Sequence, residues 1–445
     1  MKIFLTLLCT SVLPFILWAS PAYAASSDNA CGVIGEEIIP LRVPNFDVPI
    51  LWKRVTGVDG PDIPVDLISL ADGGFVVVGE SAEYNKDKGM GANQLYLARV
   101  DINGKIIWEK RYPVKGFIHA SHGIAVKDRL VVLSAVEEGK NKSVRLDFTD
   151  GLGAVKTSKT ISDEIYDLTP EGIASLPNSP VMTIALWASN RKNPDDNFTI
   201  LKQVTAEGRE VSSRQYLPGL PNRLESFQKT ADGDLIGSGQ IRENGVNAGW
   251  IFSVDGQSGD LKFQRPYLRG FQSNLHAIAQ DTDGSYIAIG DSVPTDAGLR
   301  AAWVMKINAK GSPIWQRYVQ GKYAFSGRDV SVAKDGRIIA MVNARPSSKD
   351  GGREHVRLMT FTPEGKLEGD EALIEGANAQ GVDLLVRDHS RIVTGVTSSG
   401  LGSYGLAKDQ RAAGWDIWML GLPKLSAFQN PCGSRKVSDS FDEGL

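Results

Sequence analysis

Histidine, carboxylate and arginine side chains recur at the starts of several short apolar segments, where they could act together if those segments meet. Side chains of these types could bind a metal ion or an anionic ligand, or supply an acid and a base for hydrolysis or elimination. The candidates are Asp66, His119, His122, Arg223, Glu225, His276, Arg328, Asp329 and Asp383. Three of them, Asp66, Asp329 and Asp383, stand at equivalent positions of a repeat, which favours a structural role in which each carboxylate bonds to neighbouring backbone.

The motif HASH at 119–122 places two imidazoles three residues apart. That spacing suits a metal ion on a helix, but on a strand it puts the two side chains on opposite faces. Only a turn at this point would let both bind one ion, so no metal site is assigned. His355 and His389 lie in or beside turns and are expected to face solvent.

Two oxygen-rich segments, DTDG at 281–284 and NPDDN at 193–197, resemble parts of calcium loops. Neither has the full spacing of such a loop with its terminal Glu, so both are interpreted as simple turns. The serines stand in no G-x-S-x-G arrangement, and the sequence therefore gives no signal for a hydrolase nucleophile.

The elements that must position these side chains repeat about every 50 residues. A turn between two apolar strands occurs seven times, at 67–79, 123–134, 172–186, and again from 226, 277, 330 and 384. Its clearest anchors are Asp72, Asp232, Asp283 and Asp335. A period of this size indicates a propeller or a solenoid, and Asp-Gly supplies the positive φ that a tight hairpin needs.

Each repeat continues with a polar loop, a third strand and a second glycine turn that leads into an outer strand, as in GKIIWEKRY at 104–112. Four strands per repeat predict a propeller blade. The last repeat ends after its third strand at 416–423, while ILWKRV at 50–55 has the outline of an outer strand and precedes the first repeat. We therefore expect an all-β, seven-bladed β-propeller whose N-terminal strand completes the last blade and leaves no open edge.

This repeat resembles the exported bacterial propellers of the quinoprotein dehydrogenase-like (PQQ-like repeat) superfamily. Gly104, Lys105 and Trp108 match the family's Gly-Lys-x-x-Trp docking pattern, in which Trp stacks over the neighbouring blade, and Gly311 with Trp315 matches with one inserted Pro. The resemblance covers about 48–426 and specifies a fold better than an activity, because the family includes both cofactor-bearing dehydrogenases and non-catalytic scaffold proteins. Its dehydrogenases hold their cofactor beneath adjacent half-cystines with a calcium ion, and this chain has no adjacent cysteines. The cofactor is therefore unknown, with PQQ or calcium as alternatives.

The first 24 residues have the features of a secretory signal peptide, with an apolar stretch from Ile3 to Trp18 and small residues at Ala22 and Ala24 before the expected cleavage point. The two cysteines that remain, Cys31 and Cys432, are expected to form a disulfide in an oxidising compartment, since closure of the ring brings the two ends together. The expected organisation is a signal peptide (1–24), an N-terminal segment (25–47), the propeller (48–426) and a polar C-terminal tail (427–445).

A formal net charge of −3 without basic runs argues against nucleic acid as a partner. The mature chain is expected to be a periplasmic or secreted monomer with no transmembrane segment. The sequence supports two functions. The first is a binding or scaffold protein that presents its loops and central funnel to a protein or glycan partner. The alternative is a periplasmic enzyme, either a quinoprotein-type dehydrogenase or a lyase or lactonase that uses funnel carboxylates and histidines.

Overall fold

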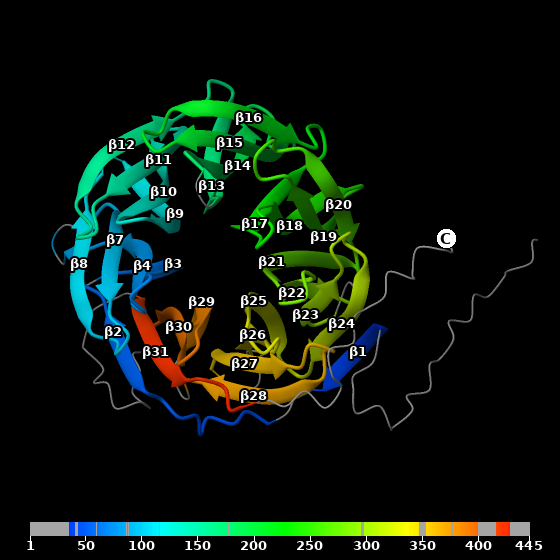
Figure 1. The fold of residues 1–445 in the computed structure, drawn as a ribbon. Coiled ribbons are helices and arrows are strands. Elements are labelled where there is room, and N and C mark those ends of the chain that lie inside the picture. Colours follow the sequence, from blue (N-terminus) through cyan, green and yellow to red (C-terminus); the bar gives the residue numbers. More distant parts are fainter. Residues whose placement is uncertain are drawn as a thin grey trace, which may run out of the picture.

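Seven four-stranded antiparallel sheets form a closed ring in the computed structural model (Figure 1). The structure describes residues 35–40, 43–58, 60–85, 87, 89–114, 116–176, 179–294, 298–346, 353–374, 378–398 and 415–427. In this part of the chain all regular elements are strands, and none is a helix that could span a membrane. The prediction of an all-β, seven-bladed propeller is confirmed.

Within each blade the strands follow one another from the ring axis outward. Blade 1 consists of β3 (Asp62–Ser69), β4 (Phe75–Ser81), β7 (Gln94–Val100) and β8 (Ile106–Tyr112), and its loop holds the small hairpin of β5 (Tyr84–Asn85) and β6 (Gly89–Met90). Blade 2 consists of β9 (Phe117–Val126), β10 (Arg129–Glu138), β11 (Asn141–Thr149) and β12 (Val155–Ile161). Blade 3 consists of β13 (Tyr166–Ser175), β14 (Val181–Asn190), β15 (Asn197–Thr205) and β16 (Glu210–Tyr216).

Blades 4 to 6 repeat this order. Blade 4 consists of β17 (Asn222–Lys229), β18 (Leu235–Glu243), β19 (Val246–Val254) and β20 (Leu261–Tyr267). Blade 5 consists of β21 (Gln272–Gln280), β22 (Tyr286–Val293), β23 (Ala301–Ile307) and β24 (Pro313–Gln320). Blade 6 consists of β25 (Ala324–Val332), β26 (Ile338–Arg345), β27 (His355–Phe361) and β28 (Leu367–Leu373).

Blade 7 combines strands from the two ends of the part of the chain that forms the propeller. Its inner strands are β29 (Ala379–Val386), β30 (Ser390–Thr397) and β31 (Asp416–Pro423), and its outer strand is β2 (Trp52–Thr56). The pairing of β2 with β31 is antiparallel, from Trp52 opposite Gly421 to Thr56 opposite Ile417. The N-terminal strand therefore completes the last blade, as the outline of ILWKRV predicts.

The core lies between adjacent blades, where apolar faces of neighbouring sheets pack together. One cluster joins blades 5 and 6 through residues such as Ile289, Phe325 and Val342, all of them buried. Middle strands such as β23 and β27 are buried along their whole length, since both faces of each sheet contact another blade. These strands consequently read as nearly continuous apolar runs.

The tryptophan that recurs in the outer strands shows how one blade docks on the next. In blade 7, Trp52 lies against Gly104 of blade 1, where an added Cβ atom would stand 2.3 Å from the indole ring. Two residues further, Arg54 Nε donates to the Gly104 carbonyl at 2.9 Å. Gly104 has a positive φ of 77°, which turns its carbonyl toward the preceding blade. Trp108 on Gly153 and Trp315 on Gly365 repeat this contact.

The repeat did not predict two features of the N-terminal part of the chain, an added strand and a segment that crosses blade 6. A further strand, β1 (Gly35–Pro40), pairs in parallel with β24 and makes blade 5 five-stranded. In Figure 1 it lies beside β24, well away from β2, although both belong to the N-terminal part of the chain. The segment between them crosses blade 6, where the Asn45 carbonyl accepts a hydrogen bond from Ala372 N at 2.8 Å.

Candidate functional site

The axial carboxylates Asp66, Asp329 and Asp383 each follow a β-bulge in an innermost strand, in β3, β25 and β29. The bulge adds one residue to the strand and re-aims the side chain that follows it. As a result each carboxylate reaches across to the next blade, where it accepts a backbone hydrogen bond. The donors are Gly123 N to Asp66 Oδ2 at 2.8 Å, Leu384 N to Asp329 Oδ2 at 2.8 Å, and Leu67 N to Asp383 Oδ2 at 2.6 Å.

These three carboxylates come from consecutive blades 6, 7 and 1. Burial raises the pKa of Asp383 well above its usual range, and the negative charges of Asp329 and Asp66 raise it further. Burial also raises the pKa of Asp329 to about 6, against the lowering effect of the hydrogen bonds from Leu384 and Val330. Asp329 and Asp383 therefore hold protons at a pH where isolated aspartates would be ionised.

The two histidines of HASH lie in β9 and point to different carboxylates. His119 Nδ1 lies 3.4 Å from Glu80 Oε2, and His122 Nδ1 lies 3.8 Å from Asp66 Oδ2. The hydrogen bond with Glu80 raises the pKa of His119, whereas burial lowers the pKa of His122. In the described residues, no group of three or more His, Cys, Asp or Glu side chains could hold a metal ion.

Arg223 forms an ion pair that sequence reasoning missed. Its Nε donates to Glu171 Oε1 at 2.9 Å, and Glu171 Oε2 accepts from Leu224 N at 2.8 Å. The predicted Glu225 is a weaker partner, with its Oε1 3.9 Å from Arg223 Nε. Burial raises the pKa of Glu171 to about 8, although Arg223 opposes this shift. A comparison of the repeats could have found Glu171, because it occupies the same position as the predicted Glu225. The two are the extra residues of the bulges in β13 and β17.

His276 is the corresponding extra residue of β21, and it contacts Asp291 of β22, a second residue that sequence reasoning missed. Three groups surround Asp291 Oδ2: His276 Nε2 at 2.8 Å, Ser326 Oγ at 3.0 Å and Arg300 Nη1 at 3.3 Å. Burial favours a raised pKa for Asp291, but the hydrogen bond with His276 and the charges of His276 and Arg300 outweigh it and lower the pKa. An aspartate inside the apolar run YIAIGDSV was the available signal.

Arg328 is the extra residue of the bulge in β25 and is exposed. Arg328, Arg300 and His276 therefore come from the two neighbouring blades 5 and 6, and Asp329 directly follows Arg328 in β25. Asp66 and Asp383 belong to blades 1 and 7. The structure thus places the predicted arginine and one of the axial carboxylates together on blade 6.

The histidines outside the ring axis differ from expectation in one case. His389 is exposed, as expected, but His355 is buried and only 5% exposed. Its ring makes edge contacts with Phe46 and Tyr323, at centroid distances of 5.6 and 6.0 Å. The prediction that His355 faces solvent is wrong, because the N-terminal segment covers it.

The axial end that carries the starts of the innermost strands also exposes large apolar side chains. We name this end the loop face; it consists of the loops that precede the innermost strands and of the loops between the second and third strands of each blade. Its exposed apolar side chains are Ile63, Phe117, Ile165, Leu268, Phe271 and Leu299. They surround the axial charged groups on the sides of blades 1, 2, 3 and 5.

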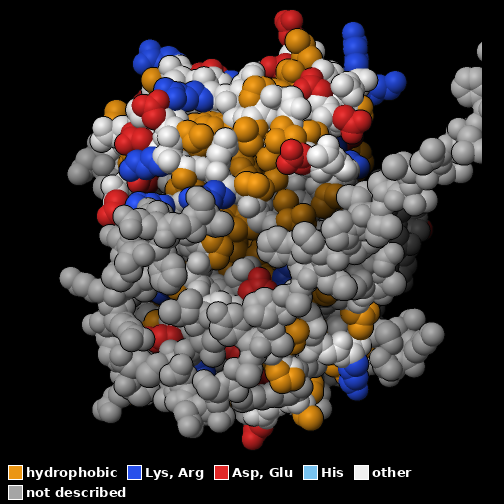
Figure 2. Space-filling view, turned by 90° about the vertical axis from the view of Figure 1, so that its right-hand side faces the viewer, with side chains coloured by type: hydrophobic (Ala, Val, Ile, Leu, Met, Phe, Trp, Pro, Cys, Tyr) orange, Lys and Arg blue, Asp and Glu red, His pale blue; other side chains and the backbone are white. Residues whose placement is uncertain are grey.

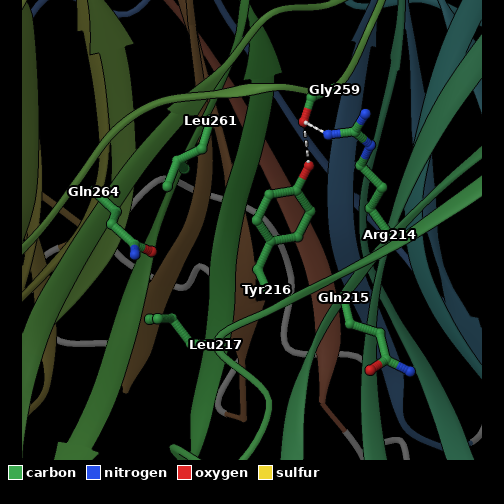
Figure 3. A pocket seen from close by; sticks show the side chains of 7 residues that line it. All are labelled: Arg214, Gln215, Tyr216, Leu217, Gly259, Leu261 and Gln264. Atoms are coloured by element: carbon green, nitrogen blue, oxygen red, sulfur yellow. Dashed lines mark hydrogen bonds between the residues drawn. The ribbon is translucent and has the colours of Figure 1, made fainter.

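The outer wall has a separate shallow depression of about 460 Å³ between blades 3 and 4 (Figure 3). Tyr216 Oη and Arg214 Nη1 donate to the Gly259 carbonyl at 2.8 and 3.3 Å, so this is the docking contact of blade 3 on blade 4. At the position of Trp108 and Trp315, however, blade 3 has Ser212. Blade 3 therefore docks on Gly259 through Arg214 and Tyr216, without an indole ring over the glycine.

Comparison with known proteins identifies no family for the chain. No protein family model matches the chain, and no curated protein does. A mutant of puromycin hydrolase has 14% identity and a TM-score of 0.46 over 76% of this chain and 50% of that chain. The WD40 domain of Neurospora crassa Pan2 has 10% identity and a TM-score of 0.45, covering 83% and 91% of the two chains. The propeller domain of the trilobed protease from Pyrococcus furiosus has 9% identity and a TM-score of 0.45, covering 84% of this chain and 98% of that chain. The chain thus spans about half the length of puromycin hydrolase.

The cysteines Cys31 and Cys432 and the expected signal peptide lie outside the described residues.

Proposed function

We propose that this chain is an exported binding or scaffold protein that holds a protein partner on its loop face. The observation that carries the proposal is the set of exposed apolar side chains around the axial charges. Phe117 and Phe271 are each more than half exposed, with 55% and 52% of their surface accessible. Large exposed apolar side chains that gather at one end of a molecule are typical of protein-binding surfaces, and aromatic residues are enriched in such surfaces.

The hydrogen bonds of the axial carboxylates indicate a structural role for these residues. This role in turn supports a binding function for the protein. Asp66, Asp329 and Asp383 already accept backbone hydrogen bonds from the next blade. A carboxylate that holds two blades together cannot move freely as an acid, a base or a calcium ligand. The residues of the ring axis therefore do not fit the calcium-assisted quinone cofactor of a quinoprotein dehydrogenase, and no step is assigned to such a group.

A glycan partner is compatible with the same surface, since Phe117 and Phe271 could stack on sugar rings. Arg328 and Arg300 would then select acidic sugars. The protein partner is favoured because the aliphatic Ile63, Ile165 and Leu299 offer a sugar neither a flat ring nor a hydrogen bond.

Site-specific crosslinking in the source cells tests the loop face. A photoreactive phenylalanine analogue is placed at Phe117 or Phe271, and matched controls carry it at Ile107 on the outer wall, which is 52% exposed. Both loop-face positions should give a discrete adduct with the same protein, and Ile107 should give none. Equal adduct formation at all three positions, or none at the loop face, would contradict the proposal.

One observation favours an enzyme as the second candidate. His276 and buried Asp291 form a pair at 2.8 Å, and a carboxylate so placed could orient an imidazole as a general base. Lyase or lactonase chemistry would then rest on His276 and Arg300. If His276→Gln abolishes turnover of a lactone or uronate panel while the melting temperature stays within about 2 °C, the enzyme candidate gains. If the wild-type chain turns over no member of the panel, it fails.

A further inference from the structure

We propose that the outer edge of blade 5 is a binding site for an extended acidic peptide segment of a partner protein, and that β1 occupies this site in the resting chain. The inference concerns the outer wall and is independent of the loop face. Among the described blades, only blade 5 carries a fifth strand, and that strand runs parallel to β24. Sheet edges bind added strands through backbone hydrogen bonds, while side-chain pockets supply specificity.

The first specificity group is Arg269, in the loop before β21. It forms an ion pair with Glu36 of β1, and its guanidinium stacks on the Tyr318 ring at 3.6 Å from the centroid. Ser273 Oγ and Ser292 Oγ both donate to the Arg269 carbonyl, each at 2.9 Å. These contacts come from blade 5 itself, so Arg269 is held in place independently of β1.

The second group is Arg317, whose side chain is fully buried. Its Nε donates to the Gly365 carbonyl at 2.7 Å, and its guanidinium lies 5.1 Å from the Trp315 ring centroid. Burial lowers the pKa of Arg317, and Glu37 is the charge that opposes this effect. The Glu37 carboxylate lies 3.4 Å from Arg317. A buried cation that is compensated by a carboxylate on the added strand selects for an acidic residue at that place.

The third group is an apolar socket. Ile39 is buried and joins the core cluster of blades 5 and 6, together with Val319 and Phe325. Its neighbours Ile38 and Pro40 are exposed. The edge therefore recognises two consecutive acidic residues followed, two positions later, by a β-branched apolar residue.

The strand itself contributes little that would keep it in place. Only Ile39 of the strand is buried, whereas the backbone of all six residues must be ordered when the strand docks. Glu36 and Glu37 are half-exposed, so solvent screens part of the attraction in their ion pairs. Since Arg269 and Arg317 are pre-organised, a partner segment that also buries the position of exposed Ile38 would bind better than β1 does.

Figure 2 looks onto the wall that carries β20 and β24. Hydrophobic side chains gather on the upper half of this wall, bordered by Lys, Arg, Asp and Glu. This apolar surface favours a partner protein over an isolated peptide.

The test uses the full chain with Glu36→Lys and Glu37→Lys, a double change that should release β1 by charge repulsion. A fluorescein-labelled peptide of sequence GEEIIP serves as the probe, and GKKIIP as its control. Fluorescence anisotropy should show GEEIIP binding to the released variant at least tenfold more tightly than to the wild-type chain, where β1 competes at high local concentration. GKKIIP should bind neither chain.

Arg269→Ala in the released background should weaken GEEIIP binding at least fivefold. The matched control is Arg214→Ala, which changes the arginine of blade 3 that corresponds to Arg317 and should leave binding unchanged. Hydrogen exchange at β24 verifies release, and Ile39→Asp provides a second way to achieve it. Failure of GEEIIP to bind after release, or protection of β24 that persists in both variants, would overturn the proposal. So would a concentration-dependent dimer of the wild-type chain that the double change abolishes, because the edge would then belong to β1 of a second copy.

Discussion

Asp383 stands between two other carboxyl groups, and this placement makes stability depend on pH. The pKa of Asp383 is raised in the folded chain, and that of Asp329 is raised to about 6, whereas both are near 3.8 when unfolded. The folded state therefore binds more protons, and its free energy of unfolding falls as pH rises from about 4 through 6 and beyond. Thermal unfolding should show a higher melting temperature at pH 5 than at pH 7.5, by an amount equivalent to on the order of 1 kcal/mol. Asp383→Asn should reduce this difference, and an unchanged difference would contradict the assignment.

The packing of blade 7 on blade 1 depends on a single residue, Gly104. Gly104→Ala should destabilise the chain by about 2–4 kcal/mol, because the new methyl group would meet Trp52 at a positive φ. Gly139→Ala is the control: its φ is also positive, at 66°, but no heavy atom lies within 4 Å. Urea unfolding of both variants measures the difference. Equal losses would show that backbone conformation, and not the Trp52 contact, requires Gly104.

The sequence predicted the contacts of some single residues and missed those of others. The equivalent positions of Asp66, Asp329 and Asp383 predicted their bonds to neighbouring backbone. Glu171 and Asp291 were missed, because Glu171 precedes a glycine as a turn residue would and Asp291 lies within a buried strand. The grouping of His276 with Arg300 and Ser326 depends on two strands and a loop that meet only in three dimensions, so no spacing in the sequence reveals it.

At the scale of the element, the outer strand is a docking device with three parts. In blades 1, 4, 5 and 7 an aromatic side chain covers the glycine of the next blade. In blades 3, 5 and 7 an arginine two residues later bonds the carbonyl of that glycine, and in blades 1, 3 and 4 a tyrosine two residues after that position does the same. Blades 2, 3 and 6 have Thr157, Ser212 and Gly369 in place of the aromatic residue.

Ser212→Trp should therefore supply the missing aromatic contact between blades 3 and 4. The indole would cover Gly259 as Trp315 covers Gly365, and the gain in the free energy of unfolding should be about 0.5–1.5 kcal/mol. Ser213→Trp is the matched control, since its side chain points to the opposite face of β16. Chemical denaturation compares the two variants, and stabilisation by Ser213→Trp alone would refute this docking role of position 212.

The strands and turns of the blades were predictable because each repeats the same alternation and the same glycine turn. The strand β1 was not, because GEEIIP occurs once and has no counterpart in the other repeats. Its position depends on Arg269 and Arg317, far away in the chain, and a search for periodicity cannot detect such a pairing.

At the scale of the whole molecule, closure rests on β2. Trp52→Ala removes a side chain that stacks on Phe75 of blade 1 and lies against Gly421 of its own blade. We expect a loss of about 3 kcal/mol, with faster hydrogen exchange throughout blades 7 and 1. Trp108→Ala breaks a docking contact between two blades that the chain joins directly, so its effect on exchange should stay local. Similar local effects in both variants would argue against closure by β2.

The covalent part of closure remains a prediction. Cys31 precedes β1 and Cys432 follows the last described residues, and a bond between them would tie the N-terminal segment to the C-terminal tail. A mass spectrum of the unreduced mature protein should show it two hydrogens lighter than after reduction, and beginning after Ala24. Two free thiols would contradict the disulfide, and retention of residues 1–24 would contradict the signal peptide.

The antiparallel pairing of β2 with β31 also has a consequence for biosynthesis. The ribosome makes β2 before any of the blades and β31 after all of them, so the strand that emerges first must wait for the strand that emerges last. Until then β2 is an unpaired strand with an exposed indole, and a growing chain with six finished blades is still an open arc. The nascent protein therefore needs protection during synthesis, and a ribosome that stops before residue 423 releases a product that cannot close.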